Sequence, residues 1–238
     1  MDHPRRRDFL TRACSAALVT SGGLVSLASV GTAARAAEKK KKTGDDDDVA
    51  PPEDLMREHG LLNRILLIYE EGIRRVDAKQ AFPSEAIAGA ADIVRRFVEE
   101  YHEKLEEDFL FTRFEKANKL VDLVRVLRRQ HQAGRRLTAT ILKQASGRLP
   151  MTGELETLLD CLRGFIRMYR PHEAREDTVL FPAIRSVVEP KEFEALGQIF
   201  EEKEHKLFGK DGFEGMVAEV AKLEETLGID DLDQFTPR

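Results

Sequence analysis

Residues 102–111 of this chain read HEKLEEDFLF, and residues 172–181 read HEAREDTVLF. Each stretch is His-x-x-x-Glu followed by Leu-Phe, and the two stretches begin seventy residues apart. Residues four apart lie on the same face of an α-helix, so each stretch directs an imidazole and a carboxylate to one place. Two such pairs brought face to face supply two nitrogen and two carboxylate ligands, which is a donor set for a metal centre.

Residues 1–36 have the features of a twin-arginine export signal. Arg6 and Arg7 precede Phe9-Leu10, a mildly apolar run follows at 16–30, and Ala34-Arg35-Ala36 offers a small-x-small cleavage site. These features predict export through the twin-arginine pathway to the periplasm, with no stable membrane span once the signal is removed. An uncleaved membrane anchor is the alternative, but the run is short and polar for a span.

The remainder of the chain divides into a linker, one domain and a tail. Residues 37–52 carry a block of Lys and then a block of Asp, which predicts a disordered charged linker. Residues 53–228 are long enough for one domain with a substantial core, and residues 229–238 form a C-terminal tail. Charged residues make up 34% of the chain and Trp is absent, as in many helical proteins. The net charge of −5 gives no reason to propose nucleic acid as a partner.

Apolar residues spaced three and four apart predict long amphipathic helices joined by short turns. The four long helices are expected at about 53–76, 84–109, 117–146 and 152–180. A fifth helix is expected at about 191–208, and a last one ends near Leu227. The buried faces are expected to include Leu120, Val179 and Leu207. The prediction is an all-α protein, an up-down antiparallel four-helix bundle with additional C-terminal helices.

Polar residues interrupt these apolar faces where Leu would be expected: His59, His102, Glu106, His131, His172 and Glu176. Burying an ionised carboxylate in an apolar bundle costs several kcal/mol unless something compensates the charge. A bound cation turns that cost into a gain. A single helical His is most often a surface or hydrogen-bonded core residue, but that explanation must here hold for four His and both copies of the repeat. The six residues therefore predict a metal site.

The order of these six residues resembles the hemerythrin-like (HHE cation-binding) domain, over roughly Asp54 to Phe208. The successive His are separated by 43, 29 and 41 residues, which suits helix hairpins. The resemblance implies an up-down four-helix bundle that holds a non-haem di-iron centre. It also implies that the four His divide between two Fe ions, with Glu106 and Glu176 as bridges, and Zn or Mn as possible substitutes.

Two departures from the oxygen-carrying hemerythrins affect the ligand set. Those carriers have a second His four residues after the one that corresponds to His131, where this chain has Arg135. They also use His-x-x-x-x-Asp on the last helix, a spacing that Asp177 satisfies; we favour Glu176 and keep Asp177 as a substitute. Because that His is missing, His205 is a seventh candidate ligand. The alternative is that His205 lies at the surface or contacts a ligand without binding the metal.

Ferritin-like di-iron proteins offer a rival pattern, because they use Glu-x-x-His twice. Glu99 with His102 and Glu202 with His205 fit that spacing. That alternative leaves three His on core faces unexplained, and Glu99 is expected off the inner face of its helix. The hemerythrin-like assignment is therefore preferred.

Two tyrosines, Tyr69 and Tyr169, are also expected on inner faces. Most buried tyrosines pack with a hydrogen-bonded hydroxyl, but a phenol beside iron can ligate, donate a proton or quench an oxidant. Together with these tyrosines, further carboxylates beside the candidate ligands weakly favour a reactive centre over an oxygen carrier: Glu103, Glu107, Glu173 and Asp177.

Three functions remain open at this stage. The first is a binding protein for O2 or a related small diatomic, because a nitrogen-rich set of imidazoles and carboxylates suits Fe(II) and accepts Zn, Mn or Co. The second is a di-iron enzyme that detoxifies peroxide or NO. The third is an iron-responsive buffer or sensor. The sequence shows no nucleophile–base pair or phosphate loop that would indicate a larger substrate.

Overall fold

The computed structural model describes residues 49–146 and 152–237, which fold into helices without any strand. The expected export signal and most of the charged linker lie outside these residues. Within the described part, no helix combines the length and apolar character needed to cross a membrane. Three long α-helices are uninterrupted: α1 (Pro51–Asp77), α5 (Val121–Ala145) and α6 (Thr152–Arg175).

The fourth long helix is a continuous rod that changes its winding along its length. It runs through α2 (Ser84–Ile93), η1 (Val94–His102), α3 (Glu103–Leu105), η2 (Glu106–Leu110) and α4 (Phe111–Lys116). Both η1 and η2 are π-helical, a rare winding that is frequent at functional sites.

The helix that contains the second His-x-x-x-Glu copy has the same feature. α6 continues into the π-helical η3 (Glu176–Leu180), then α7 (Phe181–Ala183) and the 3-10 turn η4 (Ile184–Ser186). In both copies a π-helical segment thus begins at the glutamate of the motif. The repeat seen in the sequence is therefore also a repeat of backbone conformation.

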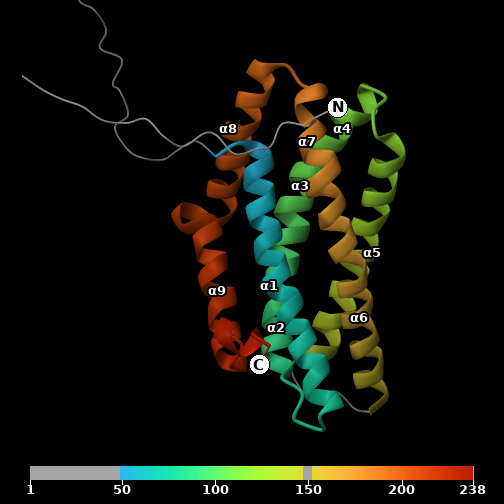
Figure 1. Ribbon diagram of the computed structural model, residues 1–238, viewed down its shortest axis with the longest axis vertical. Helices are drawn as coiled ribbons and strands as arrows, with labels where there is room; N and C mark the ends of the chain where they lie inside the picture. Colours follow the sequence, from blue (N-terminus) through green and yellow to red (C-terminus); the bar gives the residue numbers. More distant parts are fainter. Residues whose placement is uncertain (1–48, 147–151, 238) are drawn as a thin grey trace, which may run out of the picture. The chain divides into compact units, whose positions relative to one another are not determined.

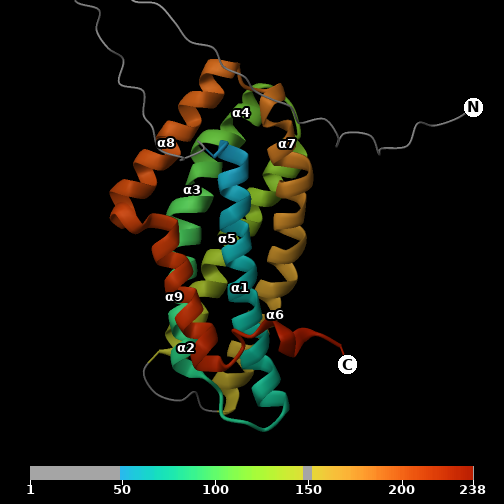
Figure 2. The same cartoon turned by 60° about the vertical axis from the view of Figure 1, so that its left-hand side comes forward.

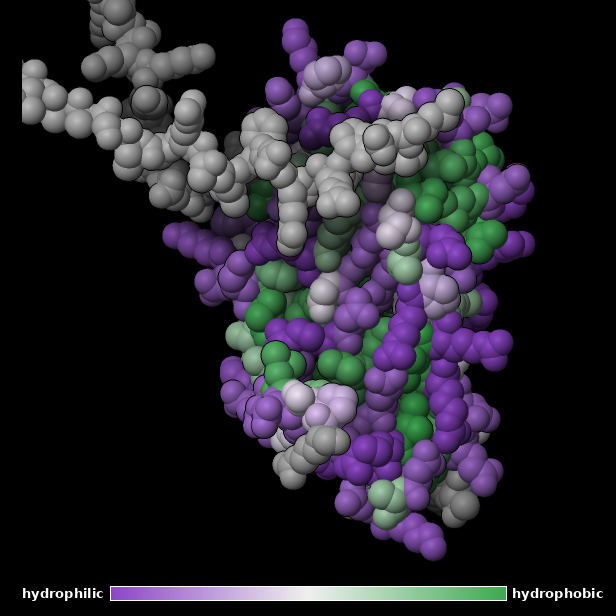
Figure 3. Space-filling model, in the orientation of Figure 1, coloured by the Kyte–Doolittle hydropathy of each residue, from purple (hydrophilic) through white to green (hydrophobic). Residues whose placement is uncertain are grey.

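The long helices form the predicted four-helix bundle (Figure 1), in which α1 and α5 each contact both α6 and α2. A helical pair, α8 (Pro190–Phe208) and α9 (Gly212–Leu227), packs along α1 and the α2–η1 rod, as Figure 2 also shows. Short 3-10 turns complete the chain: η5 (Gly209–Asp211) and η6 (Leu232–Phe235). Hydrophilic side chains cover most of the face drawn in Figure 3, with apolar side chains visible between them. The largest fully buried side chains are aromatic and lie within the bundle or between it and the α8–α9 pair: Tyr69, Tyr101, Tyr169, Phe97, Phe111, Phe114, Phe165, Phe181 and Phe200.

Helix boundaries differ from expectation at two places. α1 begins at Pro51, inside the expected linker, because proline suits the first helical turn, where no backbone N–H is needed. The helix expected from residue 117 begins only at Val121, since Asn118 and Leu120 have positive φ angles of 53° and 50° and make a turn.

Three residues expected on buried faces are partly exposed: Leu120 (37%), Val179 (38%) and Leu207 (55%). Leu120 belongs to the turn before α5. Val179 lies in η3, where π-helical winding shifts side chains away from the 3.6-residue period that the prediction assumed. On α8, the aromatic ring of Phe208 packs on Phe97 and Tyr101, and Leu207 faces away.

Candidate metal centre

Four imidazoles converge inside the bundle, one from each long helix. The Nε2 atoms of His59 and His102 lie 3.1 Å apart, and those of His131 and His172 lie 3.3 Å apart. We call His59 and His102 the first pair, and His131 and His172 the second pair. All four side chains are at most 3% exposed. The structure thus brings together the four His that the sequence placed on separate inner faces.

Two glutamates lie between the pairs, and each contacts one His of each pair. Glu106 Oε2 is 3.7 Å from His102 Nε2 and 3.4 Å from His131 Nε2. Glu176 Oε2 is 3.5 Å from His59 Nε2 and 3.0 Å from His172 Nε2. Each carboxylate is therefore placed to bridge two metal positions, one at each His pair.

The electrostatics of these carboxyl groups fit a bound cation. Glu106 and Glu176 are fully buried, and none of their four carboxylate oxygens has a hydrogen-bond partner. Burial, together with the neighbouring Glu176, raises the pKa of Glu106 to about 7, and burial raises the pKa of Glu176 to about 7. Buried polar atoms are almost always partnered, so carboxylate oxygens that have no hydrogen-bond partner and face imidazole nitrogens are suited to binding a cation. The residues present therefore fit a pair of divalent metal ions.

An oxygen atom partners the other ring nitrogen, Nδ1, of every imidazole. These partners are Asp177 for His59 at 2.7 Å, Glu58 for His102 at 2.5 Å, Glu107 for His131 at 3.1 Å and Gln130 for His172 at 3.0 Å. Because carboxylate and carbonyl oxygens accept hydrogen bonds, an Nδ1–H donates to each of them. The Nε2 lone pairs then point to the centre, as metal ligation requires.

The protonation of the imidazoles differs between them. Burial and the neighbouring His lower the pKa of His102 well below its usual value, and burial lowers the pKa of His172 to about 4. Burial also acts to lower the pKa of His131, but Glu103, Glu106 and Glu107 outweigh it and raise that pKa well above its usual value. The neighbouring carboxylates therefore favour the protonated form of His131 when no metal balances their charge.

The phenylalanine that ends each motif copy also belongs to the centre. Phe181 stacks on the imidazole of His59, and Phe111 stacks on that of His131, with ring centroids 5.4 Å apart in both cases. Each copy thus supplies a His, a bridging Glu and an aromatic wall for the single His of another helix. This explains why the repeat extends to Leu-Phe.

Two candidate ligands from the sequence lie outside the centre. Asp177 does not join the bridging carboxylates, because it holds the outer nitrogen of His59. His205 is an exposed residue of α8 and joins none of the metal-competent groups found in the described part of the chain. Glu202 is exposed as well, while Glu99 is buried at 6% exposure, contrary to expectation. The two Glu-x-x-His pairs of the ferritin-like alternative are therefore not brought together.

Arg135 takes the place of the additional His found in oxygen carriers and acts as an internal cation. Its Nη2 lies 2.7 Å from Glu103 Oε2 and 2.8 Å from Glu107 Oε1. Glu107 in turn holds His131, so Arg135 is connected to the centre through one carboxylate.

The sequence interpretation missed two of the outer partners, Glu58 and Gln130. Each directly precedes a single His of the centre, His59 or His131, and reaches across to the His of a motif copy. The only signal in the sequence is this shared position, which does not by itself indicate a contact between helices.

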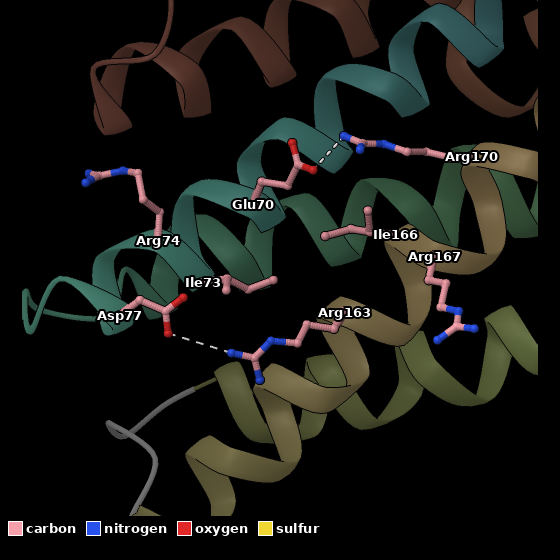
Figure 4. Close-up of a pocket in the computed structure, with 8 residues that line it drawn as sticks. All are labelled: Glu70, Ile73, Arg74, Asp77, Arg163, Ile166, Arg167 and Arg170. Carbon is pink, nitrogen blue, oxygen red and sulfur yellow. Dashed lines mark hydrogen bonds and ion pairs between the residues drawn. The ribbon is translucent and has the colours of Figure 1, made fainter.

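A surface groove of about 560 Å³ lies away from the centre, between α1 and α6 (Figure 4). Its walls carry two ion pairs, Arg170–Glu70 at 2.6 Å and Arg163–Asp77 at 3.7 Å, on either side of Ile73. No residue that lines this groove belongs to the centre. This groove is therefore separate from the buried His and Glu.

Comparison with known proteins agrees with this site. Residues 50–184 match the hemerythrin HHE cation binding domain, and the chain belongs to this family of cation-binding helical proteins. Its relatives include uncharacterized proteins of Mycobacterium bovis and of Mycobacterium tuberculosis strains CDC 1551 and H37Rv. Each is 50% identical over 187 residues, which cover 78% of this chain and 73% of the relative. No solved structure matches the chain.

Proposed function

We propose that the centre holds two iron ions and binds O2 or a related small diatomic. The observation that supports this most directly is the set of four unpartnered carboxylate oxygens between two pairs of Nε2 atoms. Each metal position then has two imidazoles and two bridging carboxylates, so coordination positions stay open for a small ligand. When bound, such an iron pair binds or reduces O2, peroxide or NO.

The surrounding residues orient the ligands and exclude water. The Nδ1 partners hold each imidazole in one orientation, which tunes its donor strength. The rings of Phe111 and Phe181 close the centre on two sides. These features favour a protected site in which a bound diatomic is shielded from bulk water.

A second candidate function, a di-iron enzyme that removes peroxide or NO, is favoured by a phenol and charged side chains that are connected to the centre. Tyr169 donates to Glu103 at 2.7 Å, Glu103 pairs with Arg135, and Arg135 pairs with Glu107, which holds His131. Proton donors beside a metal centre promote the breakdown of bound peroxide. The two functions thus use the same centre and differ in how fast protons arrive.

The deciding experiment counts iron per protein and records the visible spectrum of the reduced protein before and after O2 is added. We expect two irons and an absorption band that appears with O2 and disappears on deoxygenation. A single irreversible oxidation, or consumption of added peroxide, would favour the enzyme. Absence of stoichiometric metal in folded protein would overturn both, and His205→Ala, outside the centre, serves as a control that retains iron.

We also propose that the protein is exported through the twin-arginine pathway, on the basis of Arg6 and Arg7 and the apolar run after them. That pathway carries folded proteins, so iron loaded in the cytoplasm would travel with the bundle. Replacing both arginines by Lys should trap the chain in the cytoplasm, which fractionation and mass measurement of the N-terminus would detect.

A further inference from the structure

Tyr169 occupies a position against a ligand of the second pair. Its ring lies edge-on to the imidazole of His172, with centroids 5.4 Å apart, and it is 1% exposed. On its other side it stacks on Phe165 at 4.3 Å. The phenol is therefore in aromatic contact with the centre without being a ligand.

The hydroxyl of Tyr169 has a proton acceptor, which distinguishes it from the other tyrosines. It donates to Glu103 Oε1 at 2.7 Å. The chain has three tyrosines and no tryptophan, and all three tyrosines are buried. The hydroxyl of Tyr69 has no hydrogen-bond partner, and that of Tyr101 lies near Glu58, which already accepts from His102 Nδ1. A buried phenol that loses an electron must also release its proton, and Tyr169 combines a hydrogen-bonded acceptor with ring contact to a His of the centre, so the geometry best prepares Tyr169 for oxidation.

The surroundings of Tyr169 are built around this hydrogen bond. Arg135 Nη2 lies 2.7 Å from Glu103 Oε2, the oxygen opposite the one that accepts from Tyr169, and so fixes the position of this carboxyl group. Gly134 on α5 leaves the space for the hydroxyl, since a Cβ at that position would lie 2.1 Å from Tyr169 Oη. A bulkier residue at 134 is incompatible with the contact.

We propose that Tyr169 donates one electron to the metal centre when hydrogen peroxide oxidises that centre. This inference rests on the proposed iron centre. Reduction of one peroxide to two waters takes two electrons and two protons; Tyr169 supplies one of these electrons and the bound metal pair the other. The phenolic O–H bond breaks, its proton passes along the existing hydrogen bond to Glu103, and a neutral phenoxyl radical remains. Because the phenolic proton stays on Glu103, both protons that the peroxide consumes come from solvent.

The test uses iron-loaded full-length protein mixed with hydrogen peroxide, frozen and examined by electron paramagnetic resonance. We expect a tyrosyl radical whose spectrum narrows when the protein contains ring-deuterated tyrosine. Tyr169→Phe should lose the signal, while Tyr69→Phe and Tyr101→Phe should keep it. Glu103→Gln, which retains a side chain of the same shape but removes the proton acceptor, should also lose it at unchanged iron content.

Several outcomes would overturn the inference. A radical that survives in Tyr169→Phe, or that disappears in Tyr101→Phe, assigns the electron to another residue. An iron centre that peroxide oxidises without any tyrosyl signal excludes Tyr169 as donor while leaving the proposed function intact. Failure to bind iron, by contrast, would overturn the proposed function itself, so the two failures are distinguishable by metal analysis of the same samples.

Discussion

The two His pairs are held by the same pattern of contacts but by chemically different partners. In the first pair, both Nδ1 groups face carboxylates, Glu58 and Asp177. In the second pair, His172 faces the neutral amide of Gln130. The remaining partner, Glu107, already shares its charge with Arg135 at 2.8 Å and Lys104 at 2.6 Å.

This difference indicates that the two metal positions are electronically unequal. A carboxylate that accepts from Nδ1–H makes the imidazole a stronger donor to a metal, and an amide does so less. We therefore expect His102, which faces Glu58, to be a stronger donor than His172, which faces Gln130, while His131 stays a strong donor because the neighbouring carboxylates raise its pKa. The second pair also contacts Tyr169 through His172. The repeat supplies the ligands, and the residues that accept from Nδ1 distinguish the first His pair from the second.

The largest effect on metal content is expected from the carboxylates of Glu106 and Glu176, which contact both His pairs. Glu106→Ala or Glu176→Ala removes a ligand from both positions, so each variant should lose both metal ions. His59→Ala and His172→Ala should each lose mainly the ion at their own pair. Metal content of purified protein, measured by mass spectrometry, checks this, with His205→Ala as the matched control. A Glu176→Ala protein that still binds two ions would show that the carboxylates do not bridge.

The next effect concerns the free energy of unfolding of the metal-free protein. Each bridging carboxyl has a pKa of about 7 in the folded state against 4.5 when exposed, so the folded state holds protons that the unfolded chain has released. Stability from these groups is therefore present at low pH and lost as pH rises from about 4.5 to about 7. The Glu106→Gln/Glu176→Gln protein does not lose this stability. Its free energy of unfolding, compared with that of the wild type, should therefore rise as pH increases from about 4.5 to about 7, by at most about 3 kcal/mol per carboxyl group.

Urea unfolding at several pH values, with chelator present, measures this difference. Comparison with the double variant removes the contributions of titrating groups that do not contact Glu106 or Glu176; the lowered pKa values of His102 and His172 act with the opposite sign. A difference that does not change with pH would show that the carboxyls ionise normally in the folded state. Adding iron should reverse the order, because only the wild type retains the bridging ligands.

Most of the fold follows from sequence periodicity, because long amphipathic helices with short connections have few ways to pack. The six central residues were predictable for the same reason, since each interrupts an apolar face with a group that is costly to bury. Periodicity fails where the backbone leaves the α-helical period. Val179 in the π-helical η3 and Leu120 in a left-handed turn were both placed on the wrong side for this reason.

The outer partners could not be predicted, because they depend on contacts between helices. Gln130 and Glu58 sit at comparable positions beside a central His, but only the packed bundle shows which Nδ1 each one reaches. His205 illustrates the converse error. It has a ligand's chemistry and a plausible spacing, yet α8 packs outside the four-helix bundle and leaves it exposed.

A smaller effect is expected from exchanging the outer partners of the two halves. Glu58→Gln gives His102 the neutral partner that His172 has, and should weaken metal binding at the first pair by about 10–100-fold. Gln130→Glu gives His172 a carboxylate and should tighten the second position. Titration of each variant with metal against a competing chelator measures both constants. If the wild type shows two equal constants that neither change separates, the electronic inequality of the halves is disproved.

The smallest effect concerns protein stability and tests the packing around Tyr169, which lies beside the second His pair. It compares alanine substitutions at two glycines, Gly134 and Gly60. Gly134→Ala on α5 would place a Cβ 2.1 Å from Tyr169 Oη, whereas Gly60→Ala on α1 meets nothing within 4 Å. Alanine favours a helix over glycine by about 1 kcal/mol, so Gly60→Ala should stabilise the protein by about that amount. Overpacking costs about 1–3 kcal/mol, so Gly134→Ala should destabilise it by about 1–2 kcal/mol after the helix gain.

A double variant separates the hydroxyl from the ring in that contact. Tyr169→Phe removes the closest atom, but Cζ and Cε2 would still lie 2.9 Å and 3.0 Å from the new Cβ, so Gly134→Ala/Tyr169→Phe should recover only part of the loss. Thermal or urea unfolding of the four proteins gives the coupling energy. Full stability of Gly134→Ala would mean that Tyr169 readily moves away from Glu103. In that case packing would not hold the hydrogen bond between Tyr169 and Glu103, and a fixed tyrosine would no longer distinguish the second His pair from the first.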